Sequence, residues 1–546
     1  MNLLIKILNN RIASIICFSF AIANRIIFTS LYSLMSTDTG VQFTYTRNFL
    51  AGKGMGVTKY FTSDLNTPVY DPHLFFPPGW SLTIIPFLKI TNGDEFKALF
   101  VFDIFAAILF VVAMRILGKK AGLSTAYNNI LSLIIGCSQY VFFMSWSSTD
   151  VISLCFILFS FAILIDIVYL QKELNFVKIA GASLLFCLPF FFRYQYLFIA
   201  GLVPLLVLIY GIFFKNKTLK SLGWKLLICS LSWLLLIFLI NSSVGGNILH
   251  INNQERGIFF DQVIHWYPFI PASFINLDFG AQLAARITSI NYSYVMSVFK
   301  LINVFLFVLF TFFLVRYIRK YKPVLINSRN SILFISGIVI ALSVIILLAF
   351  LSLTYRDLEW GNIKWNFSID ERYFAFIYVF IPVLLLSFLN SFPTLFKKPI
   401  VRLLIYAAFV LFFIEVAHGI YYNVKIISNN KDLVAIKNSD LAYKEFPDIV
   451  SQIKNQYPDR QILISSPDQF YLHTASQLGF KAVFDYQNLS KKDLIVNSKS
   501  ILILPVHMNE EVIMKEYLDK KKPRSIATND GTYFYFEELN PNDSDE

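Results

Sequence analysis

The stretch KALFVFDIFAAILFVVAMRILGKK, residues 97–120, decides the class of this protein. Between its first lysine and Arg115 it contains a single charged residue, Asp103, and it closes with Lys119 and Lys120. An apolar run of roughly 20 residues is long enough to cross the hydrocarbon core of a bilayer as a helix. Lysine and arginine gather in the short cytoplasmic loops beside such helices. The stretch therefore predicts a transmembrane helix whose C-terminal end faces the cytoplasm.

Runs of the same kind recur along most of the chain. Of its 546 residues, 56% are hydrophobic and only 15% are charged, whereas soluble proteins carry about 25% charged residues. The runs lack the alternation of polar and apolar residues that is typical of membrane β-barrels. We therefore predict a polytopic α-helical membrane protein with about 11 transmembrane helices. These spans are expected near residues 12–33, 97–117, 126–146, 150–170, 178–193, 194–214, 224–245, 294–317, 331–353, 373–391 and 401–421.

The basic residues decide the predicted orientation. They gather at alternate ends of the spans, within residues 6–11, 115–120, 172–178, 215–225, 316–322 and 397–402. These ends are expected in the cytoplasm, which places the N-terminus inside. The same placement accounts for the net charge of +12 without a nucleic-acid partner. The chain is expected in a plasma membrane of the bacterial type, in contact with membrane lipids.

The other side of the membrane is predicted to carry a first outer loop and a separate domain. The loop, about residues 34–96, belongs to a membrane domain that we place at residues 1–421. Farther along, strand patterns such as QILISS (461–466) and TYFYFEEL (532–539) alternate with amphipathic helical patterns. Such alternation indicates a small α/β domain. It is expected at residues 435–540, on the extracytoplasmic side.

Two acids at predicted outer ends of spans are candidates for chemistry. Asp38 follows the first span in STDTGVQFTY (36–45), and Asp150 opens another span in SWSSTDVISL (145–154). Asp38 could be a general base or a metal ligand, and Asp150 could bind a divalent cation or orient a hydroxyl. The alternatives are a solvated carboxylate for Asp38 and an acid that favours the helix dipole for Asp150. A divalent cation is the only cofactor that these residues suggest.

Basic residues form the second group of candidates. Arg193 stands between two apolar runs, and Arg372 stands at the outer mouth of a late span. Charges in such places are costly and often face a cavity, and a guanidinium binds phosphate through a planar fork. Lys364 is a weaker candidate of the same kind. For all three, the alternative is that the aliphatic stem lies in apolar surroundings while the charge reaches water.

Four stretches, taken in order, resemble the GT-C class of membrane glycosyltransferases, in the branch of protein O-mannosyltransferases and bacterial aminoarabinose transferases. They are STDTGVQFTYTRNFLAGKGM (36–55), YDPHLFFPPGWSLTIIPFL (70–88), SSTDVISLCFILFSFAILI (147–165) and DERYFAFIYVFIPVLLL (370–386). The first and third carry the two acids, the second is rich in proline, and the fourth enters a late span with Arg-Tyr. The resemblance covers nearly the whole chain and implies a helical bundle with an outer cavity.

The resemblance also implies a reaction. A hexosyl or pentosyl group would move, with inversion, from a polyprenyl-phosphate donor to an envelope glycan, lipid or protein. Asp38 would act as the base, and Asp150 would hold the acceptor or a metal. The donor phosphate would be bound by a set of cationic and tyrosine residues: Arg372, Tyr373, Arg193, Tyr194 and Lys364.

Two other functions compete with this reading. A membrane transporter or lipid flippase is the main alternative, although no inverted repeat is evident in the sequence. A non-catalytic scaffold whose C-terminal domain binds an envelope partner is another. The long first outer loop and the outer α/β domain favour the enzyme.

Overall fold

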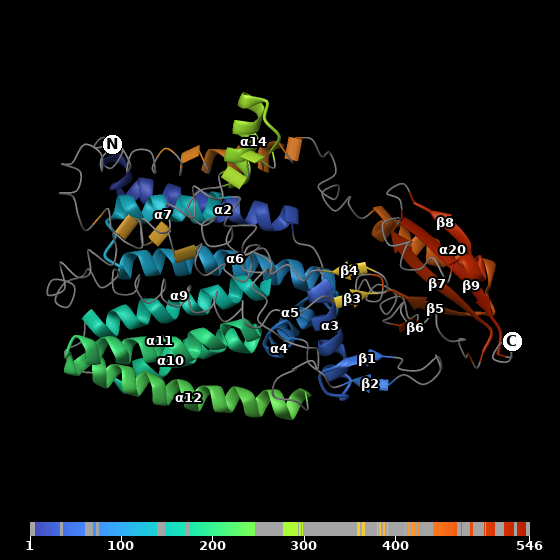
Figure 1. Ribbon diagram of the computed structural model, residues 1–546, viewed down its shortest axis with the longest axis horizontal. Helices are drawn as coiled ribbons and strands as arrows, with labels where there is room; N and C mark the ends of the chain where they lie inside the picture. Colours follow the sequence, from blue (N-terminus) through green and yellow to red (C-terminus); the bar gives the residue numbers. More distant parts are fainter. Residues whose placement is uncertain are drawn as a thin grey trace.

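The structure is a computed structural model that describes residues 6–32, 37–59, 69–71, 76–138, 148–169, 175–245, 277–292, 358–360 and 363–365. It also describes single turns within 294–298 and 379–428, and residues 441–466, 471, 481–483, most of 496–507, 518–528 and 532–541. Figure 1 shows a bundle of long helices with a β-sheet beyond one of its ends. We refer to that end as the sheet end and to the opposite one as the far end.

Seven helices of the N-terminal half run along the bundle (Figure 1). They are α2 (Arg11–Tyr32), α6 (Glu95–Lys120), α7 (Thr125–Cys137), α9 (Ser148–Tyr169), α10 (Phe176–Phe192), α11 (Leu197–Phe213) and α12 (Lys217–Gly245). By length and composition α2, α6, α9 and α12 can cross a membrane, and α10 and α11 are shorter apolar helices. These helices coincide with predicted spans, whereas α7 ends at Cys137, earlier than expected. The four predicted spans after residue 293 fall largely outside the described residues.

The helix ends follow local sequence signals. The Asp94 carboxylate accepts a hydrogen bond from the backbone N of Lys97 (3.0 Å) and caps α6. The Asn175 side chain caps α10 in the same way, through the backbone N of Lys178 (3.2 Å). Such caps satisfy backbone N–H groups that have no partner within the helix. Each capping residue therefore fixes where an apolar run starts to be helical.

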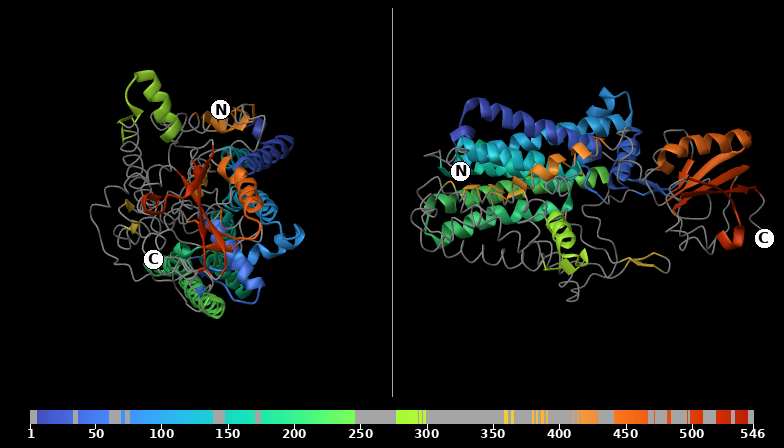
Figure 2. Two further views of the ribbon diagram at one scale, coloured as in Figure 1. Left: turned by 90° about the vertical axis from the view of Figure 1, so that its right-hand side faces the viewer. Right: turned by 90° about the horizontal axis from the view of Figure 1, so that it is seen from above.

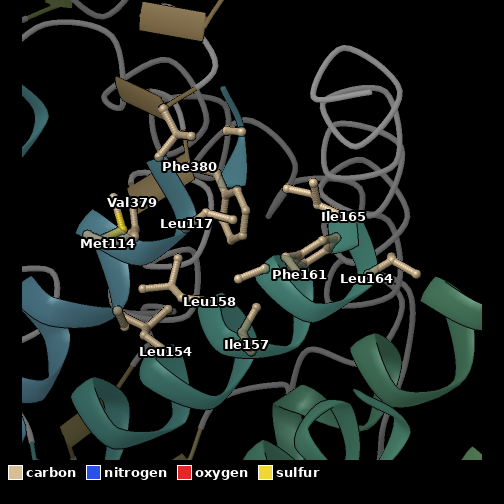
Figure 3. Packing of buried hydrophobic residues seen from close by; sticks show 14 of the residues in the cluster. Met114, Leu117, Leu154, Ile157, Leu158, Phe161, Leu164, Ile165, Val379 and Phe380 are labelled. Atoms are coloured by element: carbon tan, nitrogen blue, oxygen red, sulfur yellow. The ribbon is translucent and has the colours of Figure 1, made fainter. Parts of the chain in front are cut away.

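The centre of the bundle is a continuous apolar core around α9. Among the four membrane-length helices α9 is the most buried, while α2 and α12 are the least buried. Figure 3 shows side chains of α6 and α9 packing against a late segment of the chain that contains Val379 and Phe380. The Phe161 ring lies 5.0 Å from the Phe380 ring and 5.1 Å from the Phe186 ring, both edge to face. Residues far apart in sequence thus close one core.

The predicted first outer loop contains regular structure. It holds α3 (Thr37–Leu50), a hairpin of β1 (Val57–Lys59) and β2 (Val69–Asp71), and the short helices α4 (Gly79–Thr83) and α5 (Ile85–Ile90). All of these lie at the sheet end of the bundle, as does the hairpin of β3 (Leu358–Trp360) and β4 (Ile363–Trp365) (Figure 1). A separate helix, α14 (Leu277–Thr288), lies outside the bundle and across its axis (Figures 1 and 2).

The C-terminal part is a five-stranded sheet with one long helix on it. The strands are β5 (Gln461–Ser465), β6 (Lys481–Val483), β7 (Ser500–His507), β8 (Arg524–Ala527) and β9 (Thr532–Leu539), in the order β6-β5-β7-β9-β8. The first three are parallel to one another, and β9 pairs antiparallel with both β7 and β8. Helix α20 (Leu441–Gln456) packs Phe446, Val450 and Ile453 against one face. The right-hand view in Figure 2 also shows this unit beyond the sheet end.

Candidate functional site

Two of the predicted site residues meet in a buried ion pair at the sheet end. Arg193 Nη2 lies 2.9 Å from Asp150 Oδ2, and Arg193 Nε donates to Thr149 Oγ1 (3.1 Å). The Asp150 side chain has no exposed surface, and that of Arg193 is only 10% exposed. Asp150 stands in the first turn of α9, where a negative charge is favoured by the helix dipole. The sequence analysis predicts separate roles for Asp150 and Arg193, whereas in the fold their side chains are in direct contact.

The backbone at Arg193 is set by the way α10 ends. Arg193 is extended (φ −148°, ψ 123°), and a 3-10 turn of Tyr194–Tyr196 follows before α11 begins. The end of α10 also receives α4 at very close range, because a Cβ on Gly79 would lie 2.3 Å from the Phe191 carbonyl oxygen. Only glycine permits this approach. Helix α4 therefore braces the residue that carries the guanidinium.

Helix α3, whose first turn contains Asp38, is fixed on α4 by buried polar and aromatic contacts. Ser81 Oγ donates to the Gln42 carbonyl (2.9 Å), and Thr46 Oγ1 hydrogen-bonds to the carbonyls of Gln42 (2.9 Å) and Ser81 (3.1 Å). The Phe43 ring meets Trp80 edge to face at 5.0 Å. Since α4 packs on α10, the helix of Asp38 is anchored to the same framework as Arg193. The side chain of Asp38 lies outside the described residues.

Sequence reasoning missed a buried acid in this region. Glu95, in the first turn of α6, has a side chain that is 5% exposed, and its Oε1 lies 3.8 Å from Nε of Arg47 in the last turn of α3. Arg47 Nη2 also donates to Thr44 Oγ1 (3.1 Å). The available signal was an acid directly at the start of an apolar run. We had assigned Glu95 to the outer loop, so its burial was unexpected.

Two polar groups at the sheet end, one of them on the residue after Arg193, have no hydrogen-bond partner among the described residues. Asn241 on α12 is 0% exposed, and neither its Oδ1 nor its Nδ2 is bonded within that part of the chain. The Oη of Tyr194 is also buried and unbonded there, and its ring lies 5.7 Å from Phe190. Asn241 was not predicted, and a lone carboxamide near the end of an apolar helix was its only sequence signal.

The remaining predicted site residues are not tested by the described geometry. Lys364 is opposite Glu359 in the β3–β4 ladder, but its side chain lies outside the described residues. Arg372 and Tyr373 lie outside them entirely. Within the part of the chain that the structure describes, no group of three or more His, Cys, Asp or Glu residues is placed to hold a metal ion. The roles of these residues, and the divalent cation at Asp150, stay predictions.

Among known proteins, similarity to this chain is found in structure. No family model and no curated protein matches the chain. Its structure is similar to that of ArnT from Cupriavidus metallidurans bound to undecaprenyl phosphate, with 12% identity, 96% of this chain and 97% of that chain covered, and a TM-score of 0.42. It is also similar to the oligosaccharyltransferase AglB from Archaeoglobus fulgidus in complex with an inhibitory peptide and a dolichol-phosphate. There the identity is 11%, the coverage is 96% of this chain and 74% of that chain, and the TM-score is 0.38.

Proposed function

We propose that this protein is an integral-membrane glycosyltransferase. It moves a hexosyl or pentosyl group from a polyprenyl-phosphate donor to an extracytoplasmic envelope acceptor, a glycan, a lipid or a protein. The observation that carries the proposal is the buried Arg193–Asp150 pair, which lies at the same end of the bundle as the helix of Asp38.

The energetics of the pair favour a functional role. Removing two charges from water costs several kcal/mol per ion, and their mutual attraction often fails to exceed that cost. A buried ion pair is therefore weak evidence for stability. In a membrane protein, an ionisable residue in apolar surroundings is a functional hypothesis by default. Arg193 can meet a phosphate with its planar fork, and Asp150 can orient an acceptor or hold a cation beside it.

The reaction is a single displacement. Asp38 takes the proton from the acceptor hydroxyl or amine while that oxygen or nitrogen attacks the anomeric carbon. The bond from this carbon to the phosphate oxygen breaks, and its electron pair leaves with the lipid phosphate. The leaving charge is stabilised by fixed cations and phenols in the site: Arg193, Tyr194, Arg372, Tyr373 and Lys364. One displacement inverts the anomeric configuration.

The experiment compares transfer of labelled sugar from polyprenyl carriers in membranes that contain the wild type or Asp38→Asn at equal levels. Loss of a general base lowers such rates by about 100-fold or more. Asp166→Asn is the matched control, because Asp166 pairs with Lys120 at the far end (2.5 Å), away from the site. We expect transfer in the wild type and in Asp166→Asn, and almost none in Asp38→Asn. No transfer from a broad donor panel by the folded wild type would instead favour a transporter or lipid flippase.

A further inference from the structure

Asn241 is in the C-terminal part of α12, at the sheet end of the bundle. One turn before it on α12, Ile237 belongs to an apolar cluster on which Tyr194 packs. One turn after it, Val244 packs on a second cluster that contains Val41 of α3. The stretch of α12 around Asn241 thus packs on a cluster that Tyr194 also contacts and on a cluster of the helix that carries Asp38.

The unbonded state of this carboxamide is unusual. In folded proteins roughly 90% or more of buried polar groups are hydrogen-bonded. Asn241 is 0% exposed, and within the described part of the chain both of its polar atoms are left over, together with Tyr194 Oη. Leucine has the same number and branching of side-chain heavy atoms, with larger methyl groups, and would have no polar atoms to satisfy. An asparagine at this position therefore costs stability and calls for a reason other than folding.

A second buried asparagine, Asn129, has hydrogen-bond partners for both of its polar atoms. Asn129 on α7 is also 0% exposed. Its Oδ1 accepts from Ser14 Oγ (3.1 Å) and from Arg115 Nη1 (3.1 Å), and its Nδ2 donates to the Leu8 carbonyl (2.8 Å). The two residues match in type and burial and differ only in their partners. Asn129 is therefore a natural control for Asn241.

The chemistry of the two unbonded groups selects a class of ligand. A carboxamide offers both donors and an acceptor, and a phenol offers one of each. Neither group is charged, while the nearby charges of Arg193 and Asp150 already bond each other. A neutral donor–acceptor set suits hydroxyl groups better than a phosphate. Since Tyr194 directly follows Arg193, a hydroxyl held there would belong to a group attached next to the phosphate.

We propose that Asn241 and Tyr194 form the subsite that binds hydroxyl groups of the donor sugar. The inference rests on the proposed function, because it assumes that the lipid phosphate is held beside them at Arg193. It adds that the sugar enters between the 3-10 turn, α12 and α3. Asn241 then has partners only when the sugar is bound.

The test measures binding of two kinds of probe to the purified full-length protein in nanodiscs. The first probe is bare polyprenyl phosphate, and the second is a panel of its glucosyl, mannosyl, galactosyl and arabinosyl monoesters. The proteins are the wild type, Asn241→Leu, Tyr194→Phe and the control Asn129→Leu. The quantity compared is the sugar-dependent gain in affinity. It is the ratio of the dissociation constant of bare polyprenyl phosphate to that of each monoester, measured on the same protein. The thermal midpoint of each unliganded protein is recorded as well.

We expect at least one monoester to bind the wild type more tightly than the bare carrier does. Asn241→Leu should reduce that gain roughly tenfold, as for the loss of a buried hydrogen bond, and leave binding of the bare carrier unchanged. Tyr194→Phe should also reduce the gain roughly tenfold, and it should weaken binding of the bare carrier as well, because Tyr194 is one of the residues proposed to bind the phosphate. Unliganded Asn241→Leu should melt at the same or a higher temperature than the wild type, whereas Asn129→Leu should melt lower. A conservative Asn241→Gln should keep part of the gain.

Other results would overturn the inference in distinguishable ways. If the bare carrier binds and the variants keep the full sugar-dependent gain, the subsite is wrong while the proposed function stands. The same holds if no monoester binds better than the bare carrier. A lower thermal midpoint for Asn241→Leu would show that the carboxamide is bonded in the protein and serves the fold. If the bare carrier fails to bind the folded wild type, both the inference and the proposed function are wrong.

Discussion

The two ends of the helical bundle each hold an arginine among polar side chains, and they use it differently. At the far end Arg115 donates to Ser14, Asn129 and Ser132, and its guanidinium lies 4.7 Å from the centre of the Phe18 ring. All of these partners are neutral and come from α2 and α7, while Arg115 itself is on α6. The cluster joins three helices and satisfies its members. We therefore interpret this cluster as a structural contact between the three helices.

At the sheet end Arg193 is held by an acid and a hydroxyl, with unbonded polar atoms next to it. This arrangement costs more to bury than the far-end cluster, because it removes two charges from water and leaves the Asn241 carboxamide without a described partner. The far end also leaves single oxygens of Asn128 and Asp166 without a described partner. Among the described residues, the sheet end combines a buried ion pair with a carboxamide that has no partner at either polar atom. We infer from this combination that the sheet end is kept for ligands. The predictions below test this difference.

The largest effect is expected from breaking the ion pair. Arg193→Met leaves Asp150 buried without its partner, which should lower the free energy of unfolding by about 3–5 kcal/mol. The double variant Arg193→Met/Asp150→Leu should recover most of that loss, because no buried charge remains, yet it should stay inactive in sugar transfer. Chemical denaturation of the purified proteins and the transfer assay measure both effects. Equal stability of the single variant and the wild type would contradict a closed, buried pair.

The next effect concerns the brace between α4 and α10. Gly79→Ala brings a Cβ to 2.3 Å from the Phe191 carbonyl, so α4 must move, at about 1–3 kcal/mol. Gly181→Ala on α10 is the matched control, since a Cβ there meets nothing within 4 Å. We expect Gly79→Ala to lower both the thermal midpoint and transfer, and Gly181→Ala to lower neither. Full activity of Gly79→Ala would separate α4 from the site.

A smaller effect is expected at the far end. Ser14→Ala removes one hydrogen bond to Asn129 and one from Arg115, and should cost about 1 kcal/mol of unfolding free energy. Sugar transfer per folded molecule should not change, because this cluster lies away from the site. Ser232→Ala is the control, as its exposed hydroxyl bonds only the Ile228 carbonyl of its own helix. A loss of transfer that exceeds the loss of folded protein would show that the far end also serves function.

The smallest effect distinguishes the helix caps of the two ends by pH. Partial burial alone would raise the pKa of Asp94, but the hydrogen bonds and charge of Lys97 hold it below its usual range. A lowered pKa means that the cap stabilises the protein at neutral pH and that this contribution is lost as the pH falls through the folded-state pKa. Asp94→Asn should remove this acid dependence. Asn175→Asp, at the far-end cap of α10, should introduce one.

Thermal midpoints between about pH 3 and pH 7 measure the change, since that window spans carboxyl titration. Asn175 is exposed and the Asp94 side chain is 34% exposed, so solvent screens both caps and the shifts should be small. An unchanged acid dependence in Asp94→Asn would show that other carboxylates dominate it.

Elements of the described fold were predictable from the sequence where local composition alone determines them. A bilayer requires long apolar runs, so α2, α6, α9 and α12 are visible in composition alone. The strands of the C-terminal sheet follow short β-branched and aromatic runs. Asp150 and Arg193 were found as site candidates because a charge beside an apolar run is conspicuous. Helix α3 was not found, because TDTGVQFTYTRNFL has no strong apolar periodicity. Its packing against α4, through Phe43 and Thr46, accompanies helix formation there.

What the sequence by itself determined is which segments are apolar enough to be buried in lipid and where charged residues interrupt them, since both depend on local composition. Only the tertiary structure decided which polar groups have partners. Asp150 and Arg193 are 43 residues apart and meet through the antiparallel packing of α9 and α10. Asn129 and Asn241 are alike in residue type and burial, and the helices around each one determine that the first is bonded and that the second is not bonded within the described part of the chain. Hydrogen bonding needs atoms within about 3 Å in a fixed orientation, and no local pattern specifies that.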